Sequence, residues 1–301
     1  MKNINSVMVV LDKPKHKQVA LARAHLLQTQ SGAHLHLVSF CWQAMCEEKD
    51  VFDISQRRAM KKEILRIRKE WLRGEILDRE LNFDNITIDV VWTDDIASWI
   101  NQRVTSGDFD LIIKAVHHSE SMIHTPLDWQ ILRTCSAPIL ITSSGKRARK
   151  KKPPSGNVLA AIDLRHSDKK HGILNLRVLD AANRFAEMQN AKLHCVYVVE
   201  YSKILSDLDF IDTRKVRSKA IKKSQTLLDA LIEPYPITKS RVYTPLGKVG
   251  QTVARIANKI NADLLVIGTK ANRSAEDALL GNSAERVLSR ASCDVLAVHP
   301  S

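Results

Sequence analysis

The chain has 301 residues, of which 44% are hydrophobic, so it is long enough for two domains that each bury a core. No window approaches the roughly 20 consecutive apolar residues that a bilayer requires, and no apolar N-terminal stretch follows a basic flank. We therefore expect a soluble, cytoplasmic protein without a transmembrane segment. The five cysteines are odd in number, contain no C-x-x-C pair and mostly adjoin apolar runs, which favours buried thiols over a disulfide framework.

The formal net charge of +13 is distributed unevenly along the chain. Residues 1–144 hold 18 basic and 18 acidic residues, residues 145–152 add six basic ones, and residues 153–301 hold 22 basic against 15 acidic. Prolines, a serine and a glycine follow the basic run, so residues 145–156 are predicted to be a linker between a first domain (1–144) and a second (157–301). No aromatic residues interleave the run, so specific nucleic-acid binding is not expected.

The two halves contain the same elements in the same order, which indicates a duplicated domain. The corresponding segments are VMVVLD (7–12) and VLAAID (158–163), GAHLHLVSF (32–40) and NAKLHCVYVV (190–199), DFDLIIKA (108–115) and NADLLVIGT (261–269), and LRTCSAPILIT (132–142) and LSRASCDVLAV (288–298).

Short apolar runs alternate with segments of helical periodicity in each half, which is typical of a parallel sheet covered on both faces. The second half predicts strands near 157–163, 192–199, 237–243, 263–268 and 293–299 and helices near 167–189, 212–232, 249–260 and 282–290. The fold class is therefore α/β, with two tandem doubly wound five-stranded parallel sheets of Rossmann-like type.

Ligands of doubly wound sheets bind beyond the carboxyl ends of the strands, where the strand order reverses. Asp163 and the loop after Ile267 lie at such ends, and Asp12 and the loop after Lys114 occupy the matching places in the first half. The final strands, 138–142 and 294–298, should be edge strands, so we expect the two domains to pair there as an internal pseudo-dimer. A further homo-oligomer is left open.

The loop after the fourth strand of the second half reads Gly268, two residues, Ala271, nine residues, then Gly281, Asn282 and Ser283. This pattern resembles the nucleotide-binding universal stress proteins, whose fingerprint is G-x2-G-x9-G-[ST]. Ala271 replaces the middle glycine of that fingerprint, and Asn282 replaces the hydroxyl residue.

The resemblance implies that ATP, another adenine nucleotide or another phosphate-bearing ligand is held by Asp163 and by this loop. Asp163 would contact the base or ribose, and backbone N–H groups at the helix start would hold the anion. Two structural alternatives remain open. Asn282 and Glu285 form a plausible N-cap pair, and Asp163 could cap the following turn.

The corresponding loop of the first half predicts no phosphate site of this kind. Thr125 is placed as the N-cap and Pro126 at the first helical position, where it has no N–H to donate. Asp128 in the first turn and Glu120 in the loop would repel an anion. The first domain is therefore expected to be structural or to hold a different ligand.

The tandem layout and the segments TPLDWQILRTC and GNSAERVL resemble two-domain bacterial universal stress proteins over the whole chain. The resemblance implies a non-enzymatic cytoplasmic protein that supports survival under stress, including DNA damage, with weak ATP hydrolysis left open. A nucleotide-independent interaction protein, whose basic second half binds an acidic partner or lipid head groups, is the alternative. A nucleotide-hydrolysing enzyme is disfavoured because no carboxylate cluster adjoins the loop.

Other candidate residues favour ordinary structural roles. His117, His118 and His124 lack the spacing of a metal site and are expected to be solvent-facing, so no metal ligand or catalytic residue is assigned. Cys41 and Cys46 are expected to pack inertly rather than to sense oxidants. The basic helix at 212–232 could lie on anionic lipid or a partner, but we expect it to cover the sheet with one stripe and to solvate the rest.

Overall fold

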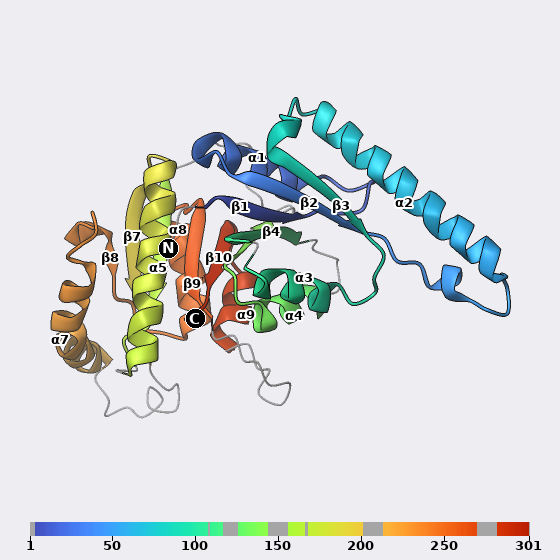
Figure 1. Cartoon of the computed structure of the whole chain (residues 1–301). Helices are drawn as coiled ribbons and strands as arrows, with labels where there is room; N and C mark the ends of the chain where they lie inside the picture. Colours follow the sequence, from blue (N-terminus) through green and yellow to red (C-terminus); the bar gives the residue numbers. More distant parts are fainter. Residues whose placement is uncertain are drawn as a thin grey trace. The chain divides into compact units, whose positions relative to one another are not determined.

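The computed structural model describes residues 4–107, 109–116, 126–143, 156–165, 168–200, 213–269 and 282–300 (Figure 1). The chain divides into two compact units, residues 2–115 and residues 116–301. Both are α/β units in which mostly parallel strands alternate with helices, as the sequence predicts.

The first unit contains four parallel strands in the order β3-β2-β1-β4. Its elements are β1 (Ser6–Val10), α1 (Val19–Ser31), β2 (His34–Phe40), the 3-10 helix η1 (Ala44–Glu47), α2 (Ile54–Leu77), the 3-10 helix η2 (Phe83–Asn85), β3 (Ile86–Val91), α3 (Ile96–Thr105) and β4 (Leu111–Val116).

Local sequence explains where these helices begin and end. Gly32 follows α1 in the left-handed conformation (φ 70°), which glycine adopts without strain. Asp53 and Gln56 form a reciprocal capping box at the start of α2. Every residue of β4 is buried, including Lys114, as expected of a strand covered on both faces.

The described residues of the second unit form six strands in the order β5-β10-β9-β6-β7-β8. Its elements are α4 (Pro126–Thr134), β5 (Ile139–Ser143), β6 (Asn157–Ile162), α5 (Lys169–Met188), β7 (Lys192–Tyr197), α7 (Thr213–Ile232), the 3-10 helix η3 (Lys239–Arg241), β8 (Val242–Tyr243), α8 (Val249–Lys259), β9 (Leu264–Gly268), α9 (Asn282–Leu288) and β10 (Asp294–Val298).

The final strands of the two repeats pair with each other. β5 runs antiparallel to β10, with Ile141 opposite Val295 and Ile139 opposite Ala297, whereas the other strand pairs of this unit are parallel. The pairing predicted from the two exposed edges is therefore confirmed. The last strand of the first sequence repeat consequently belongs to the same compact unit as the second repeat.

One strand predicted from the sequence is wrong over most of its length. Residues 237–243 were expected to form a strand, but 239–241 form η3 and only Val242 and Tyr243 pair with β7. Pro234 and Pro236 precede this segment and cannot donate to a sheet, which helps to confine β8 to its last two residues.

The basic helix α7 buries one narrow stripe, as expected. Ile221 and Leu231 are half-buried and Leu228 is 2% exposed, whereas Lys222 and Lys223 are exposed. The neighbouring Leu227 is 48% exposed and lies outside the stripe. Most of the described surface of this helix therefore faces solvent.

Candidate ligand site at the carboxyl ends of β6 and β9

The strand order of the second unit reverses at β6. β7 lies on one side of β6 and β9 on the other, with Ile162 opposite Tyr197 and Ala161 opposite Ile267. All three strands are parallel, so their carboxyl ends share one edge of the sheet. This is the switch point at which doubly wound sheets hold ligands, and Asp163 follows β6 there.

The backbone of Asp163 is fixed by the side chain of Asn175 on α5. The Asn175 amide donates to the Asp163 carbonyl at 2.7 Å and its Oδ1 accepts from the Asp163 N–H at 2.9 Å. Asn175 is only 6% exposed, so this two-point contact lies in the interior and sets the position of the residue at the strand end.

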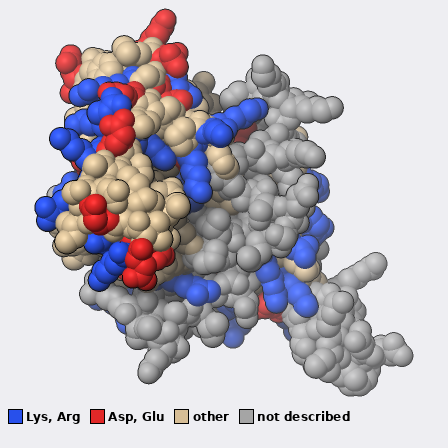
Figure 2. Space-filling model, turned by 90° about the vertical axis from the view of Figure 1, so that its right-hand side faces the viewer, with Lys and Arg blue, Asp and Glu red and all other residues tan. Residues whose placement is uncertain are grey.

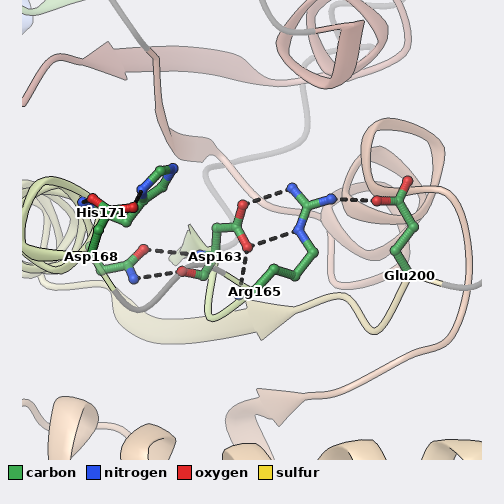
Figure 3. Close-up of polar contacts among 6 residues, drawn as sticks. Asp163, Arg165, Asp168, His171 and Glu200 are labelled. Atoms are coloured by element: carbon green, nitrogen blue, oxygen red, sulfur yellow. Dashed lines mark hydrogen bonds and ion pairs between the residues drawn. The ribbon is translucent and has the colours of Figure 1, made fainter.

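Arg165 binds both oxygens of the Asp163 carboxylate (Figure 3). Oδ1 accepts from the Arg165 N–H and Nε, each at 2.9 Å, and Oδ2 accepts from Nη2 at 2.7 Å. The third guanidinium nitrogen, Nη1, contacts Glu200, which follows the neighbouring strand β7. The contact from the Arg165 N–H corresponds to the turn-capping alternative that the sequence leaves open for Asp163.

These three side chains leave a net charge of −1 at the strand ends, since one guanidinium faces two carboxylates. The hydrogen bonds from Arg165 to Asp163 raise the pKa of Arg165, so it remains charged. The Asp163 and Arg165 side chains are about one third exposed (34% and 35%), so solutes can reach this ion pair.

The start of α5 is already satisfied by its own residues. Asp168 accepts from the His171 backbone N–H at 3.1 Å, and its other oxygen contacts His171 Nδ1 (Figure 3). The backbone hydrogen bond from His171 is the larger cause of the lowered pKa of Asp168, and the His171 side-chain contact is the next. A carboxylate therefore occupies the place where this helix start would otherwise favour an anion.

Gly268, the last residue of β9, is required by packing. A Cβ on this residue would lie 2.7 Å from both Cγ and Cδ2 of Leu174, which belongs to α5. The glycine therefore permits the close approach of α5 to the strand end, a role that the sequence analysis did not assign.

A buried polar pair lies just beyond Gly268. The hydroxyl of Thr269 is 3.0 Å from His299 Nδ1, and His299, which follows β10, is 1% exposed. Burial lowers the pKa of His299 to about 4, so the imidazole is neutral near pH 7. Within the described residues its Nε2 has no hydrogen-bond partner. Arg177 donates to the His299 carbonyl at 2.9 Å, which ties α5 to the end of β10.

Of the other candidate ligand residues in the loop after β9, the structure describes only some. Ala271 and Gly281 lie outside the described residues, while Asn282 and Ser283 are the first two residues of α9. In the first repeat α4 begins at Pro126, as predicted.

The other first-repeat candidates, Glu120, Thr125, His117, His118 and His124, also lie outside the described residues. Among the residues that are described, no group of three His, Cys, Asp or Glu side chains could hold a metal ion.

The cysteines have the buried character that the sequence predicts. All five are free, and Cys41, Cys46, Cys135 and Cys195 are buried. Burial raises the pKa of Cys41 above its ordinary value and that of Cys195 to about 12, which keeps both thiols protonated. This favours packing over oxidant sensing for Cys41.

Sequence reasoning found Asp163 but not the residues around it. Arg165 carried a usable signal, because an aspartate often accepts from the backbone two residues later. No such sequence signal exists for the other residues of the site, because they come from distant segments that only the fold brings to one edge of the sheet. These residues are Asn175, Glu200, Thr269 and His299.

Comparison with known proteins agrees with the duplicated architecture. The sequence pattern of the universal stress protein family matches residues 3–143 and again residues 156–299. Universal stress protein E of Escherichia coli K12 is 28% identical over 303 residues, which cover 98% of this chain and 94% of that protein. The protein of the same name from Photorhabdus laumondii is 25% identical over 307 residues, covering 100% and 96%.

Solved structures show the same fold. A functionally unknown protein from Pseudomonas aeruginosa PAO1 is 25% identical, with a TM-score of 0.70 and coverage of 99% of this chain and 93% of that one. A universal stress protein from Archaeoglobus fulgidus is 14% identical, with a TM-score of 0.62 and coverage of 98% and 96%. Within the described residues, no helix combines the length and apolar composition of a membrane span. Since the family pattern matches both halves and relatives align along the whole length, the chain belongs to the universal stress protein family and carries two tandem copies of its domain.

Proposed function

We propose that this tandem universal stress protein binds an adenine nucleotide or another phosphate-bearing ligand at a site made by a strand end and a helix start, and that only the second repeat retains a site of this kind. In this proposal residues 1–144 and 157–301 are the two domains, joined by the linker 145–156. The protein is cytoplasmic and supports survival under stress, including DNA damage, without catalytic chemistry of its own. Membership of the family supports the stress-response role, and the ligand and its site are the finer part of the proposal.

The observation that supports the site most directly is the position of Asp163 at the strand-order switch between β6 and β9. Its backbone is fixed by Asn175, while its carboxylate is about one third exposed. A carboxylate in this position can accept hydrogen bonds from ribose hydroxyls. The backbone N–H groups of Gly281, Asn282 and Ser283 would then donate to the phosphates.

Isothermal titration with ATP tests the proposal. The parent protein should bind one ATP per chain, and Asp163→Ala and Gly281→Pro should each weaken binding at least about tenfold, the loss expected when a charge-assisted hydrogen bond or a positioned N–H is removed. Asp12→Ala, at the matching strand end of the first repeat, is the control and should bind as the parent does. Binding that survives both second-repeat substitutions would refute the assignment.

The alternative function, a nucleotide-independent interaction protein, predicts different experimental results. Figure 2 shows Lys and Arg side chains spread over the described part of one face and interleaved with Asp and Glu, rather than gathered in one patch of single sign. Such a surface gives weak attraction that added salt screens. The alternative would be favoured if the purified protein retains no nucleotide and if the amount of partner that it captures falls sharply as salt is added.

A further inference from the structure

Two cations on the sheet-facing side of α2 lie at the carboxyl ends of β2 and β3 in the first unit. Arg68 Nη1 donates to the hydroxyl of Ser39 on β2 at 3.0 Å. Seven residues earlier, the Lys61 ammonium lies 5.4 Å from the ring centre of Trp92, which follows β3. Both cations lower the pKa of Cys41, the residue after β2, against the larger effect of its burial. Both positive charges therefore act on Cys41, at the carboxyl end of β2.

Arg68 has no carboxylate partner among the described residues. Its described contacts are the Ser39 hydroxyl, which is fully buried, and the ring of Trp71 at 5.6 Å. Desolvation by burial lowers the pKa of Arg68, which shows that its surroundings disfavour the positive charge. A guanidinium has five N–H donors, so four remain here without a described acceptor. A half-buried charge without a counterion is costly to fold.

The outer face of the same helix shows that carboxylates are available to α2. Arg66 is exposed, yet it pairs with Glu63 at 2.6 Å and with Glu70 at 2.5 Å. Arg68, two residues later on the inner face, pairs with neither. The helix therefore neutralises its solvent-facing arginine and leaves the sheet-facing one without a counterion.

Nearby acidic groups do not supply the missing counterion. Glu47 of η1 accepts from the Trp92 indole N–H at 2.9 Å, and no described ion pair joins it to Lys61 or Arg68. Asp53 caps the start of α2 through the backbone of Ser55 and Gln56. Arg57, one turn before Lys61, adds another positive charge, and its buried Nε has no described hydrogen-bond partner.

We propose that Lys61 and Arg68 form an anion site in the first unit that takes the phosphate group of a small soluble molecule. Arg68, held by Ser39, presents its remaining donors as a planar fork, and Lys61 adds a second charge from two turns away, about 10 Å along the helix axis. This site is built by α2 and the ends of β2 and β3.

Inorganic phosphate is the probe, titrated calorimetrically into the full chain at constant ionic strength set with sodium chloride. The parent should bind phosphate, and Arg68→Met should weaken binding at least about tenfold, because it removes charge-assisted hydrogen bonds. Arg66→Met, on the same helix and of the same chemistry, is the matched control and should bind as the parent does. Equal binding by the parent and Arg68→Met, or no phosphate binding by the parent, would overturn the site.

Thermal unfolding of the same three proteins separates a ligand site from a structural arginine. Without phosphate, Arg68→Met should melt at or above the parent temperature, because an unpaired half-buried charge has been replaced by an apolar chain. Phosphate should raise the melting temperature of the parent and of Arg66→Met more than that of Arg68→Met, because any phosphate bound in the second repeat stabilises all three proteins equally. If Arg68→Met instead melts below the parent and phosphate stabilises all three proteins equally, Arg68 serves packing alone and the proposal is wrong.

Discussion

Arg165 covers both carboxylate oxygens of Asp163, the residue two positions before it. The strand-end acceptor to which the family resemblance assigns a ligand contact is therefore already engaged within the chain. A ligand hydroxyl that donates to Asp163 must displace part of this contact. Arg165 can retain its bond to Glu200 when this happens, so its charge is not left without a partner.

Removing Arg165 should strengthen the binding of adenosine, which has the ribose but no phosphate. Arg165→Ala removes the guanidinium contacts to both oxygens of Asp163 while the backbone N–H contact to Oδ1 stays, and we expect about two- to tenfold tighter binding, the range of one net hydrogen bond. Calorimetric titration with adenosine measures the change. Glu200→Gln is the control, because it leaves Asp163 covered and should change affinity little. Weaker binding by Arg165→Ala would mean that the guanidinium holds the ligand instead of competing with it.

Asn175→Ala should destabilise the protein by about 1–3 kcal/mol, the cost of leaving buried polar groups unsatisfied. Both backbone groups of Asp163 would lose their partner. Urea denaturation followed by circular dichroism gives the change in the free energy of unfolding. Gln225→Ala removes an exposed side chain whose described hydrogen bond is to Asp229, and it should alter stability by less than about 0.5 kcal/mol. Equal effects from the two substitutions would contradict the role of Asn175.

Gly268→Ala should cost about 1–3 kcal/mol, because the new methyl group overlaps the Leu174 side chain. Gly172→Ala, in the first turns of the same helix α5, meets no atom within 4 Å and should be neutral or stabilising by up to about 1 kcal/mol. Adding Leu174→Ala to Gly268→Ala should relieve the overlap, so the double variant would lose less than the sum of the single losses. Strict additivity in denaturant melts would argue against this contact.

The buried imidazole of His299 should make the protein less stable in acid. Its folded-state pKa is about 4, below the ordinary 6.5, because burial disfavours the charged form. The unfolded chain therefore takes up a proton first, and stability present above pH 6.5 is lost as the pH falls toward 4, by about 3 kcal/mol. The free energy of unfolding of His299→Leu, measured from pH 7 to 4, should fall less steeply than that of the parent. His16→Gln alters an exposed histidine and should retain the parental slope.

The duplicated α/β fold was readable from the sequence because its signals are local. β4 is buried along its whole length and β9 is buried except at its last residue, and Pro126 starts α4 where its missing N–H requires no partner. The length of β8 was overestimated because the sequence does not reveal that residues 239–241 form η3, which leaves only Val242 and Tyr243 to pair with β7.

The candidate site was predictable only at Asp163. The partners of that residue come from α5 and from the end of β7, and no spacing in the sequence relates Asn175 or Glu200 to a strand end. Gly268 was assigned to a phosphate loop because glycine serves that purpose, and the structure adds that a side chain at this position would overlap Leu174. A glycine in a sequence can serve either close packing or ligand binding, and the packing role becomes visible only in the tertiary structure.

The most direct test of the central claim is a crystal structure of the full chain grown with ATP. The account predicts density for one nucleotide at the carboxyl ends of β6 and β9, with its ribose beside Asp163 and its phosphates at the start of α9. Density for a triphosphate at the start of α4, with no ligand at Asp163, would contradict it.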